Sequence, residues 1–353
     1  MKRAINNPAE DGAVDERTYI VPRELRGHRL DAVLEAWMPE VRRAALRNLV
    51  LEGSLRVNGN RQNRIRKVKE GDILFLDPKV ELDKLPRFRK KVVDVEAKPE
   101  VLYEDESCLV LLKPAGIPAV PDRHGDNSIH KHLPEWFGED ADLRIVHRLD
   151  ADTSGALLLA KGAESARELD RQFREREVHK TYLALVRGRP LQDQFECDAK
   201  IGKTISGGRV RIGDHKGGRE SLTTFEVLER FHGFALLEAH PHTGRMHQIR
   251  AHLMWIRLPL AVDKQYGRGE KILLSEIKRG YQQKRDEKPL IERQTLHAFK
   301  LAFVSPANGE KVEVEAPLPK DLSLVLDKLR RYAALRPRRS GPTHSESTRD
   351  QIQ

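Results

Sequence analysis

The segment RIVHRLDADTSGALLLAK, residues 144–161, combines a carboxylate, a cation and a turn ahead of an apolar run. Asp150 follows His-Arg-Leu, and a Thr-Ser-Gly turn leads into residues 156–160, which are apolar enough for a buried strand. We expect the turn to hold Asp150 at a sheet edge, facing a cleft. The charge of Arg148 favours an ionised carboxylate, which can act as a nucleophile or a general base. Asp150 is therefore the first candidate for a catalytic residue.

Three other interpretations of this segment are open. Asp150 and Asp152 stand two residues apart, so on a strand they would share a face, like the paired carboxylates of a glycosidase. The letters DTSG also resemble the Asp-Thr/Ser-Gly turn of aspartic proteases, but Ser154 interrupts that motif and the chain has no second copy. Asp152 by itself is expected to cap the turn through its side chain.

The segment HPHTGRMHQIRAHL, residues 240–253, gathers polar side chains around four histidines. A metal site is one alternative, but the spacing matches no standard zinc pattern and no cysteine lies nearby. A Gly-Arg turn instead predicts a polar loop that leads into a helix. There His247, Gln248 and Arg250 can donate to phosphates and base edges, and Arg250 can bind a carboxylate through two hydrogen bonds.

Two further segments bear on the site. VHKTYLALVRG, residues 178–188, is a strand by composition, with Tyr182 in its middle. A tyrosine in a strand is more often a core residue, yet an aromatic ring beside a polar cleft can stack on a flipped base. LLKPAGIPAVPDRHG, residues 111–125, is rich in Pro and Gly and predicts a shaped loop after a strand, to which the sequence assigns no chemistry.

The charge balance favours a polyanionic partner. The 353 residues carry a formal net charge of +10, for which nucleic acid is a better partner than a membrane. Many cations fall within residues 42–69, where charges of nearly one sign suit phosphate contacts, although a run of charges is often only a solvated face. The candidates for RNA contact in this region are Arg42, Arg43, Arg47, Arg56 and Lys67.

The periodicity predicts two domains of the α+β class. Residues 19–78 form a small module with helices near 30–37 and 45–50, followed by strands on either side of an Asn-Gly turn. After a charged linker, residues 79–97, a larger mixed domain with a mainly antiparallel sheet spans residues 98–335. Residues 1–18 and 336–353 are polar tails that we expect to be disordered.

Cysteine usage and hydropathy indicate a cytoplasmic protein. Cys108 and Cys197 have no metal-type or redox-type neighbours, so no disulfide framework is expected. The first residues carry no apolar run typical of a signal peptide, and no stretch is long and apolar enough to cross a bilayer. We therefore expect no membrane partner.

Together, these segments resemble the RluA family of pseudouridine synthases. KPAGIPAVP, HRLDADTSG, HKTYLALVRG and HTGRMHQIRAHL are similar to four of its sequence blocks, and LPLAVDKQYG and RQTLHAFKLAF to its closing elements. The blocks occur in the family's order over residues 98–320. Residues 19–78 resemble an S4 RNA-binding domain through RLDAVL, GSLRVNGN and KVKEGDILFL, and this domain often precedes the catalytic one.

The chain departs from these patterns in three places. RRAAL stands where S4 domains often have a Ser-Arg pair, and Val262-Asp263 stands where the synthases usually have Gly-Asp. Residues 268–290 are longer than the minimal family pattern, and this polar insertion is expected either to touch substrate or to form a surface loop.

The resemblance implies an RNA isomerase that converts uridine to pseudouridine without a cofactor or a metal. It implies that Asp150 is the essential carboxylate, acting on ribose or base, and that Arg250 pairs with it. It also implies that Arg148 helps to hold the flipped state and that Tyr182 stacks on the uracil. Large-subunit ribosomal RNA is favoured over transfer RNA as the partner, and a monomer is expected.

Two other function classes compete with this one. A ribosome-assembly factor could keep the fold and bind RNA without chemistry, but the set of Asp150, Arg148, Tyr182 and Arg250 argues against that. A glycoside or nucleoside hydrolase based on Asp150 and Asp152 would release a free base, whereas a synthase leaves the mass of the nucleotide unchanged.

Overall fold

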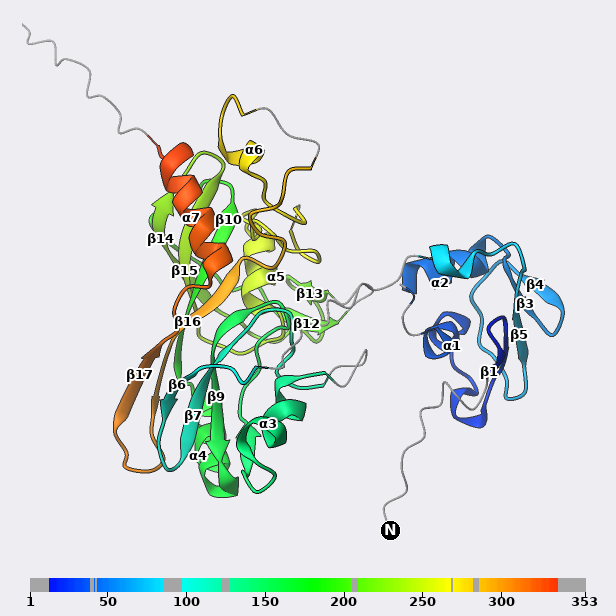
Figure 1. The fold of residues 1–353 in the computed structure, drawn as a ribbon, viewed down its shortest axis with the longest axis horizontal. Coiled ribbons are helices and arrows are strands. Elements are labelled where there is room, and N and C mark those ends of the chain that lie inside the picture. The colour runs from blue at the N-terminus through cyan, green and yellow to red at the C-terminus, as the bar shows by residue number, and fades with distance from the viewer. Residues whose placement is uncertain are drawn as a thin grey trace, which may run out of the picture. The chain divides into compact units, whose positions relative to one another are not determined.

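In the computed structural model the chain divides into two compact units, Met1–Val92 and Val93–Gln353 (Figure 1). The structure describes residues 13–38, 41, 43–85, 97–121, 127–204, 209–267, 269–281 and 286–335. We refer to the described residues before and after residues 86–96 as the N-terminal unit and the C-terminal unit. Within these ranges, no helix has both the length and the apolar composition needed to cross a membrane.

The N-terminal unit packs two helices, α1 (Leu30–Trp37) and α2 (Arg43–Leu51), against a five-stranded antiparallel sheet. Apolar residues at helical spacing in α1 are buried with Leu55 and Leu74 of the strands. Asn58 and Gly59 have φ values of 50° and 79°, which a tight hairpin turn requires. The predicted helices and hairpin are thus confirmed. The strands run in the order β1 (Ala13–Asp15), β2 (Thr18–Ile20), β5 (Ile73–Leu76), β3 (Leu55–Val57) and β4 (Asn60–Gln62).

The N-terminal unit extends beyond its predicted limits of 19–78. Strand β1 pairs with β2, so residues 13–18 belong to the fold and not to a disordered tail. At the other end, Val80, Leu82 and Leu85 pack against the core around a short 3-10 helix, so residues 79–85 are not linker. A three-residue strand and apolar residues isolated among charges carry no periodic signal. Residues 1–12 and 336–353 of the predicted tails, and residues 86–96 of the predicted linker, lie outside the described residues.

The C-terminal unit is built on a ten-stranded sheet. All of its strand pairs are antiparallel except that of β9 and β16, so the predicted mixed, mainly antiparallel sheet is confirmed. The main path is β11 (Gln194–Cys197), β14 (Thr223–Arg230), β15 (Phe234–Pro241), β10 (His179–Arg187), β16 (Leu296–Val304), β9 (Ser154–Lys161), β7 (Cys108–Lys113) and β6 (Val101–Glu104), with β17 (Lys311–Glu315) on β16 and β8 (Leu143–Ile145) on β9. Strands β12 (Ile201–Thr204) and β13 (Val210–Ile212) form a separate hairpin.

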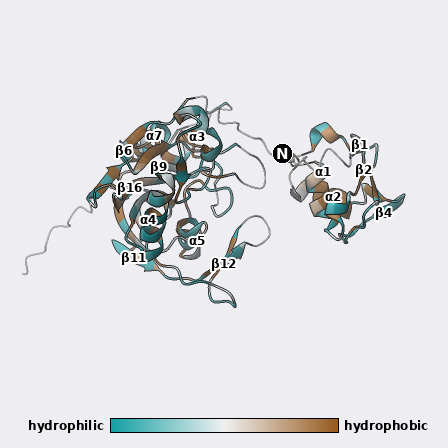
Figure 2. Ribbon diagram, turned by 90° about the horizontal axis from the view of Figure 1, so that it is seen from below, coloured by the Kyte–Doolittle hydropathy of each residue, from teal (hydrophilic) through white to brown (hydrophobic). Residues whose placement is uncertain are grey.

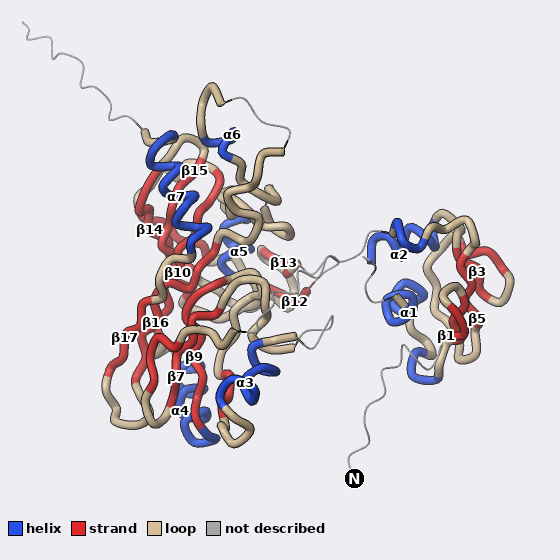
Figure 3. Tube along the Cα trace, in the orientation of Figure 1, coloured by secondary structure: helices blue, strands red, loops and turns tan. Residues whose placement is uncertain are grey.

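Helices cover both faces of this sheet (Figure 3). In β10, Leu183 and Leu185 face α7 (Lys320–Tyr332), whereas Ala184 and Val186 face α5 (Gln248–Trp255). In β9, Leu158 packs with α4 (Gly162–Glu175) and the neighbouring Leu157 with α3 (Ile129–Phe137). Because it is buried on both faces, β9 is apolar along nearly its whole length, unlike the more hydrophilic α4 (Figure 2).

Tyr182 of β10 connects the two halves of the sheet on one face. Its ring packs against both the cluster that contains α3 and the cluster that contains α5. These two helices therefore lie over the same face, with Tyr182 between them. The polar site described below is built on that face.

The described part of the insertion is an ordered element of the fold. It contains the short helix α6 (Leu274–Ile277), and Ile272 and Ile277 are buried against α7. Arg187 also donates to Glu276 over 2.9 Å. Residues 269–281 are therefore anchored to the core and are more than a surface loop.

Gly155, at the start of β9, lies very close to the backbone of the neighbouring strand β16. Its φ is +119°, and a Cβ there would lie 2.2 Å from the carbonyl oxygen of Ala298 on β16. We expect Gly155→Ala to lower the free energy of unfolding by more than about 3 kcal/mol, measured by denaturant unfolding. The control is Gly138→Ala, since Gly138 has a φ of +94° but no neighbour within 4 Å, and we expect a smaller loss of about 1–3 kcal/mol, from backbone strain alone. Equal losses in the two variants would contradict the close-approach argument.

Candidate active site

The loop that carries Asp150 is fixed to the start of β16. Thr153 donates its N–H to the Asp150 carbonyl oxygen over 3.1 Å, and its hydroxyl accepts from Gln294 Nε2 over 2.7 Å. Ser154 Oγ lies 2.9 Å from His297 Nδ1. These four partners are buried, so they specify the turn. Asp152 makes no side-chain hydrogen bond to the described residues, which corrects the expectation that it caps the turn.

A buried lysine ties a second loop to the same place. Lys113 Nζ donates to the carbonyl oxygens of Pro114, Ile117 and Ala151 over 2.8, 2.6 and 3.0 Å. Burial lowers the pKa of Lys113 to about 7. Because Ala151 follows Asp150 directly, the Pro- and Gly-rich loop acts as a support for the carboxylate. The sequence had assigned this loop no chemical role.

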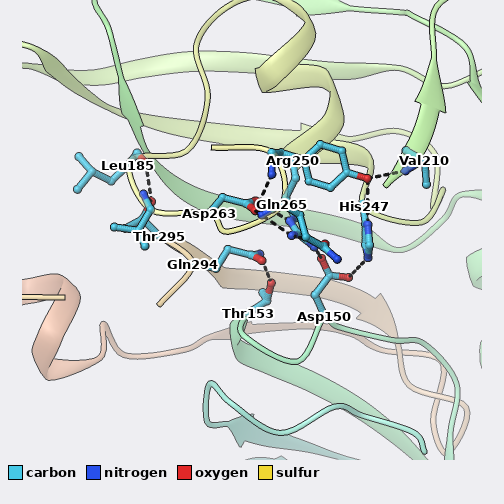
Figure 4. Close-up of polar contacts among 12 residues, drawn as sticks. Asp150, Thr153, Leu185, Val210, His247, Arg250, Asp263, Gln265, Gln294 and Thr295 are labelled. Carbon is cyan, nitrogen blue, oxygen red and sulfur yellow. Dashed lines mark hydrogen bonds and ion pairs between the residues drawn. The ribbon is translucent and has the colours of Figure 1, made fainter. Parts of the chain in front are cut away.

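Arg250, on α5, is buried between two carboxylates (Figure 4). Its Nη1 donates to Asp150 Oδ2 over 2.7 Å, which is the predicted pairing. Its Nε and Nη2 donate to Asp263 Oδ2 and Oδ1 over 2.7 and 3.0 Å, and Nη2 also donates to Gln265 Oε1 over 2.8 Å. Arg250 is 6% exposed and Asp263 is 2% exposed. The guanidinium is therefore held by Asp263 in a fork-to-fork arrangement, with one nitrogen left for Asp150.

The neighbouring carboxylates keep the Arg250 guanidinium charged. Burial alone would lower the pKa of Arg250, but its hydrogen bonds to Asp263 and the charges of Asp150 and Asp263 raise it above its ordinary value. Burial alone would raise the pKa of Asp263, but the hydrogen bond and charge of Arg250 lower it. The guanidinium of Arg250 therefore presents a positive charge to the Asp150 carboxyl group, to which its Nη1 donates.

The two oxygens of Asp150 have different surroundings. Oδ2 accepts from Arg250, whereas Oδ1 lies 4.0 Å from His247 Nε2 and accepts no hydrogen bond from the described residues. The side chain of Asp150 is 26% exposed. Oδ1 is therefore the oxygen that a bound molecule can reach.

Tyr182 and Arg148 complete the set that the sequence predicted. Burial raises the pKa of Tyr182, and the charge of Asp150 adds to this rise, so the phenol is neutral and lies within reach of the carboxylate's field. Arg148 is exposed, and no hydrogen bond or ion pair joins it to another described residue. Burial lowers the pKa of His247, and the charge of Arg148 adds a smaller effect in the same direction. The structure thus brings Asp150, Tyr182 and Arg250 together and leaves Arg148 as an exposed cation beside them.

The expectation that Gln248 contacts RNA is corrected by the structure. Gln248 is 4% exposed, its Oε1 accepts from Thr243 and Arg245, and its Nε2 donates to Leu222 and Thr223. All of its donors and acceptors are used inside the protein. Gln248 therefore shapes the loop before α5 and leaves no group free for a ligand.

The candidate RNA contacts of the N-terminal unit are only partly described. Arg47, Arg56 and Lys67 are exposed, and Arg56 donates only to the nearby Gly59 carbonyl oxygen. Arg42 and the side chain of Arg43 lie outside the described residues. Three of the five candidate cations are therefore exposed in the described part of this unit.

The four clustered histidines do not converge on one point. His240 and His242 lie beside Thr181 and Thr224, and His252 is buried beside Thr223. His247 faces Tyr266 and Asp150. Within the described ranges, no group of three or more His, Cys, Asp or Glu side chains could hold a metal ion.

Asp263, Tyr266 and Lys113 also belong to the site, although their place in it was not predicted from the sequence. Asp263 and Tyr266 stand in VDKQYG, a segment noted for its resemblance to the family's closing elements and for Val262 in place of Gly, with no role given to either residue. An isolated aspartate in a loop gives no signal of the arginine it binds. Burial of the Lys113 side chain depends on contacts with a loop about 40 residues away in sequence, which no local pattern encodes.

Substitution of Asp263 tests the two-carboxylate arrangement. We expect Asp263→Asn to lower the free energy of unfolding of the C-terminal unit by about 3–5 kcal/mol at pH 7, because Arg250 loses a buried partner. The pKa of Asp263 is lowered in the folded state, so its contribution is present above the ordinary value of 3.8 and is lost as the pH falls through the folded value. The difference between wild type and variant in urea unfolding should shrink below about pH 4. A difference that does not change with pH would contradict the assignment.

Comparison with known proteins places this site in a family. Residues 107–255 match the family described as RNA pseudouridylate synthase. Ribosomal large subunit pseudouridine synthase C of Vibrio cholerae is 32% identical over 318 residues, which are 88% of this chain and 96% of that protein. Ribosomal large subunit pseudouridine synthase D of Neisseria meningitidis is 34% identical over 322 residues, 89% of this chain and 82% of that protein.

A solved structure gives the same result for the fold. Human RNA pseudouridylate synthase domain containing 4 is similar with a TM-score of 0.52 and 26% identity, over 65% of this chain and 92% of that one. Sequence identity above 30% along most of both chains is what decides the assignment: the protein belongs to the RluA family of RNA pseudouridine synthases and is an isomerase that acts on RNA.

Proposed function

We propose that this enzyme modifies uridines in large-subunit ribosomal RNA and that Asp150 is its reacting carboxylate. The observation that carries the catalytic assignment is the position of Asp150, with Oδ2 held by buried Arg250 and Oδ1 open to a ligand. The substrate assignment is supported by the relatives, whose names specify the large ribosomal subunit.

The reaction needs a carboxylate but no external reagent. Pseudouridine forms when the N1–C1′ bond breaks, the base turns and C5 joins C1′. C5 gives up a proton and N1 gains one, so the nucleotide keeps its composition. The base must first leave the stacked helix, because its glycosidic bond is not accessible inside a duplex. An ionised Asp150 can act through Oδ1 on the ribose or on the base once the nucleotide has flipped.

Arg250 and Asp263 prepare Asp150 for this step. The two hydrogen bonds of Asp263 hold the guanidinium plane before any substrate binds. The remaining contact, from Nη1 to Asp150 Oδ2, then holds one carboxylate oxygen in place. A site built in advance in this way needs little reorganisation during the reaction.

Tyr182 and Arg148 are suited to hold the flipped nucleotide. The Tyr182 ring is held by its strand and by two core clusters, so stacking on uracil costs it little conformational entropy. Arg148 is exposed and without a partner among the described residues, so its guanidinium can occupy the vacated stack or bind a phosphate. Both roles act on binding and orientation.

The N-terminal unit is proposed to bind RNA in the manner of an S4 domain. Arg47, Arg56 and Lys67 are exposed cations on a small, stable fold. Contacts of this kind position an RNA through its phosphates and carry no direct sequence information. The unit would then raise affinity, and the choice of uridine would depend on the C-terminal unit as well.

Substitution of Asp150 tests the central assignment. We expect Asp150→Asn to reduce pseudouridine formation by at least about 10⁴-fold with RNA affinity within about twofold, because the change removes charge and keeps size. Large-subunit ribosomal RNA is incubated with the purified protein and mapped by carbodiimide-dependent stops of reverse transcription. Asp152→Asn is the matched control and should keep most activity. Substantial activity of the Asp150 variant would refute the assignment, and the absence of stops with wild type would refute the substrate.

Salt dependence tests the RNA-binding role of the N-terminal unit. We expect the triple replacement of Arg47, Arg56 and Lys67 by Gln to weaken RNA binding and to make the plot of log K against log salt shallower by about 2–3 units, as expected for lost phosphate contacts. The control replaces three exposed cations of the C-terminal unit, Arg167, Lys311 and Lys320, by Gln. An unchanged slope in the first variant, or an equal change in both, would argue against the proposed role.

A further inference from the structure

His247 has an unusual conformation next to Asp150. Its φ is 55° and ψ 22°, in the left-handed region that few residues other than glycine adopt. The side chain is only 16% exposed, with Nε2 directed at Asp150 Oδ1 and Nδ1 at the hydroxyl of Tyr266 (Figure 4). Strained backbone of this kind persists where surrounding contacts hold it.

The hydrogen bonds of Tyr266 determine which nitrogen of His247 carries the proton. The backbone N–H of Val210 donates to Tyr266 Oη over 2.7 Å, so a lone pair of that oxygen is used. Tyr266 Oη lies 3.1 Å from His247 Nδ1, and no other acceptor for the phenolic proton is found among the described residues. Donation from the phenol to Nδ1 is then the arrangement that gives this proton an acceptor within the described residues. A neutral imidazole that accepts at Nδ1 carries its proton at Nε2.

Several contacts hold the Tyr266 ring in place. Tyr266 is 4% exposed, and the guanidinium carbons of Arg250 and Arg209 lie 4.9 and 5.9 Å from its ring centre. The His247 ring meets it edge-on at 5.6 Å. Val210 belongs to strand β13, so the hydroxyl of Tyr266 also links the β12–β13 hairpin to the site.

We propose that Tyr266 is a positioning residue of the reaction, which keeps His247 in the Nε2–H tautomer and so supplies a neutral hydrogen-bond donor beside Oδ1 of Asp150. This inference rests on the proposed role of Asp150 as the reacting carboxylate. The distance of 4.0 Å is too long for a direct hydrogen bond, so the donor is free for an oxygen of the flipped uridine.

A neutral donor suits this position better than a cation. Burial lowers the pKa of His247, although the charge of Asp150 opposes this effect. A protonated His247 would form an ion pair with Oδ1 and block the oxygen that must react. The Nε2–H of a neutral ring can bind a ribose hydroxyl or a uracil carbonyl and leaves the carboxylate its charge.

The first test is spectroscopic and needs no activity. The ¹⁵N chemical shifts of the His247 ring, assigned by comparison with His247→Asn in the full-length protein, report which nitrogen is protonated. We expect the Nε2–H tautomer in wild type and a mixture of tautomers in Tyr266→Phe, because the phenolic donor is lost. An Nδ1–H tautomer in wild type, or identical shifts in both proteins, overturns the proposal whether or not the enzyme acts on ribosomal RNA.

The second test separates positioning from stability. We expect Tyr266→Phe to lower the single-turnover rate constant at saturating RNA by about tenfold, the value of one hydrogen bond, with RNA Kd within about twofold. His247→Asn, which tolerates the left-handed backbone but lacks a donor at the Nε2 position, should lose at least as much. His247→Gln can place an amide N–H near that position and should recover part of the rate.

A double variant and a control complete the experiment. If Tyr266 acts through His247, adding Tyr266→Phe to His247→Asn should cause no further loss of rate. Tyr103→Phe is the matched control, since it removes a phenolic hydrogen bond to Asp105 on the edge strand β6 and should leave the rate unchanged. Multiplying losses in the double variant, or a tenfold loss in the control, would overturn the proposal.

Discussion

The site depends on one buried guanidinium and the need to satisfy it. A charged side chain removed from water is costly unless its partners are close and well oriented. Asp263 meets this need for Arg250 with two hydrogen bonds, and Gln265 adds a third. Asp150 therefore does not have to hold the arginine in place, and its carboxylate can remain partly exposed. Asp263 is thus a buried, structural carboxylate, whereas Asp150 is a partly exposed carboxylate that a ligand can reach.

The sheet topology brings the parts of this site together. Strands β9 and β16 are the one parallel pair found among the described strands, and Ser154 and Gly155 lie opposite His297 and Ala298. Two parallel neighbours begin at the same edge of a sheet, so the loops that precede them meet there. Asp150 precedes β9 and Gln294 precedes β16, which explains why these distant segments share hydrogen bonds. The close approach at Gly155 is the steric consequence of the same pairing.

Local sequence patterns predicted many of the strands and site residues, and there are physical reasons why they missed the others. A continuous apolar run identified β9, strand-type composition identified β10, and the four blocks identified Asp150, Tyr182 and Arg250, because these features depend on residues close in sequence. Gln248 was misjudged because a polar residue ahead of a helix looks the same whether its amide faces water or four partners in the protein. Lys113 and Tyr266 gave no signal, since their partners, Ala151 and Val210, lie far along the chain. Strand β1 was missed because three residues are too few for a period.

Charge balance explains why a cation must remain exposed beside the site. Arg250 carries one positive charge, whereas Asp150 and Asp263 together carry two negative charges, so the buried group has a net charge of −1. An RNA backbone approaching a net negative centre is repelled, and the repulsion is strongest where water is excluded. Arg148, exposed and without a partner among the described residues, offsets that charge at the surface and is free to meet a phosphate or a base. A neutral His247 leaves this balance unchanged. The arrangement leaves the proposed reacting carboxylate partly exposed and still lets a polyanion approach it.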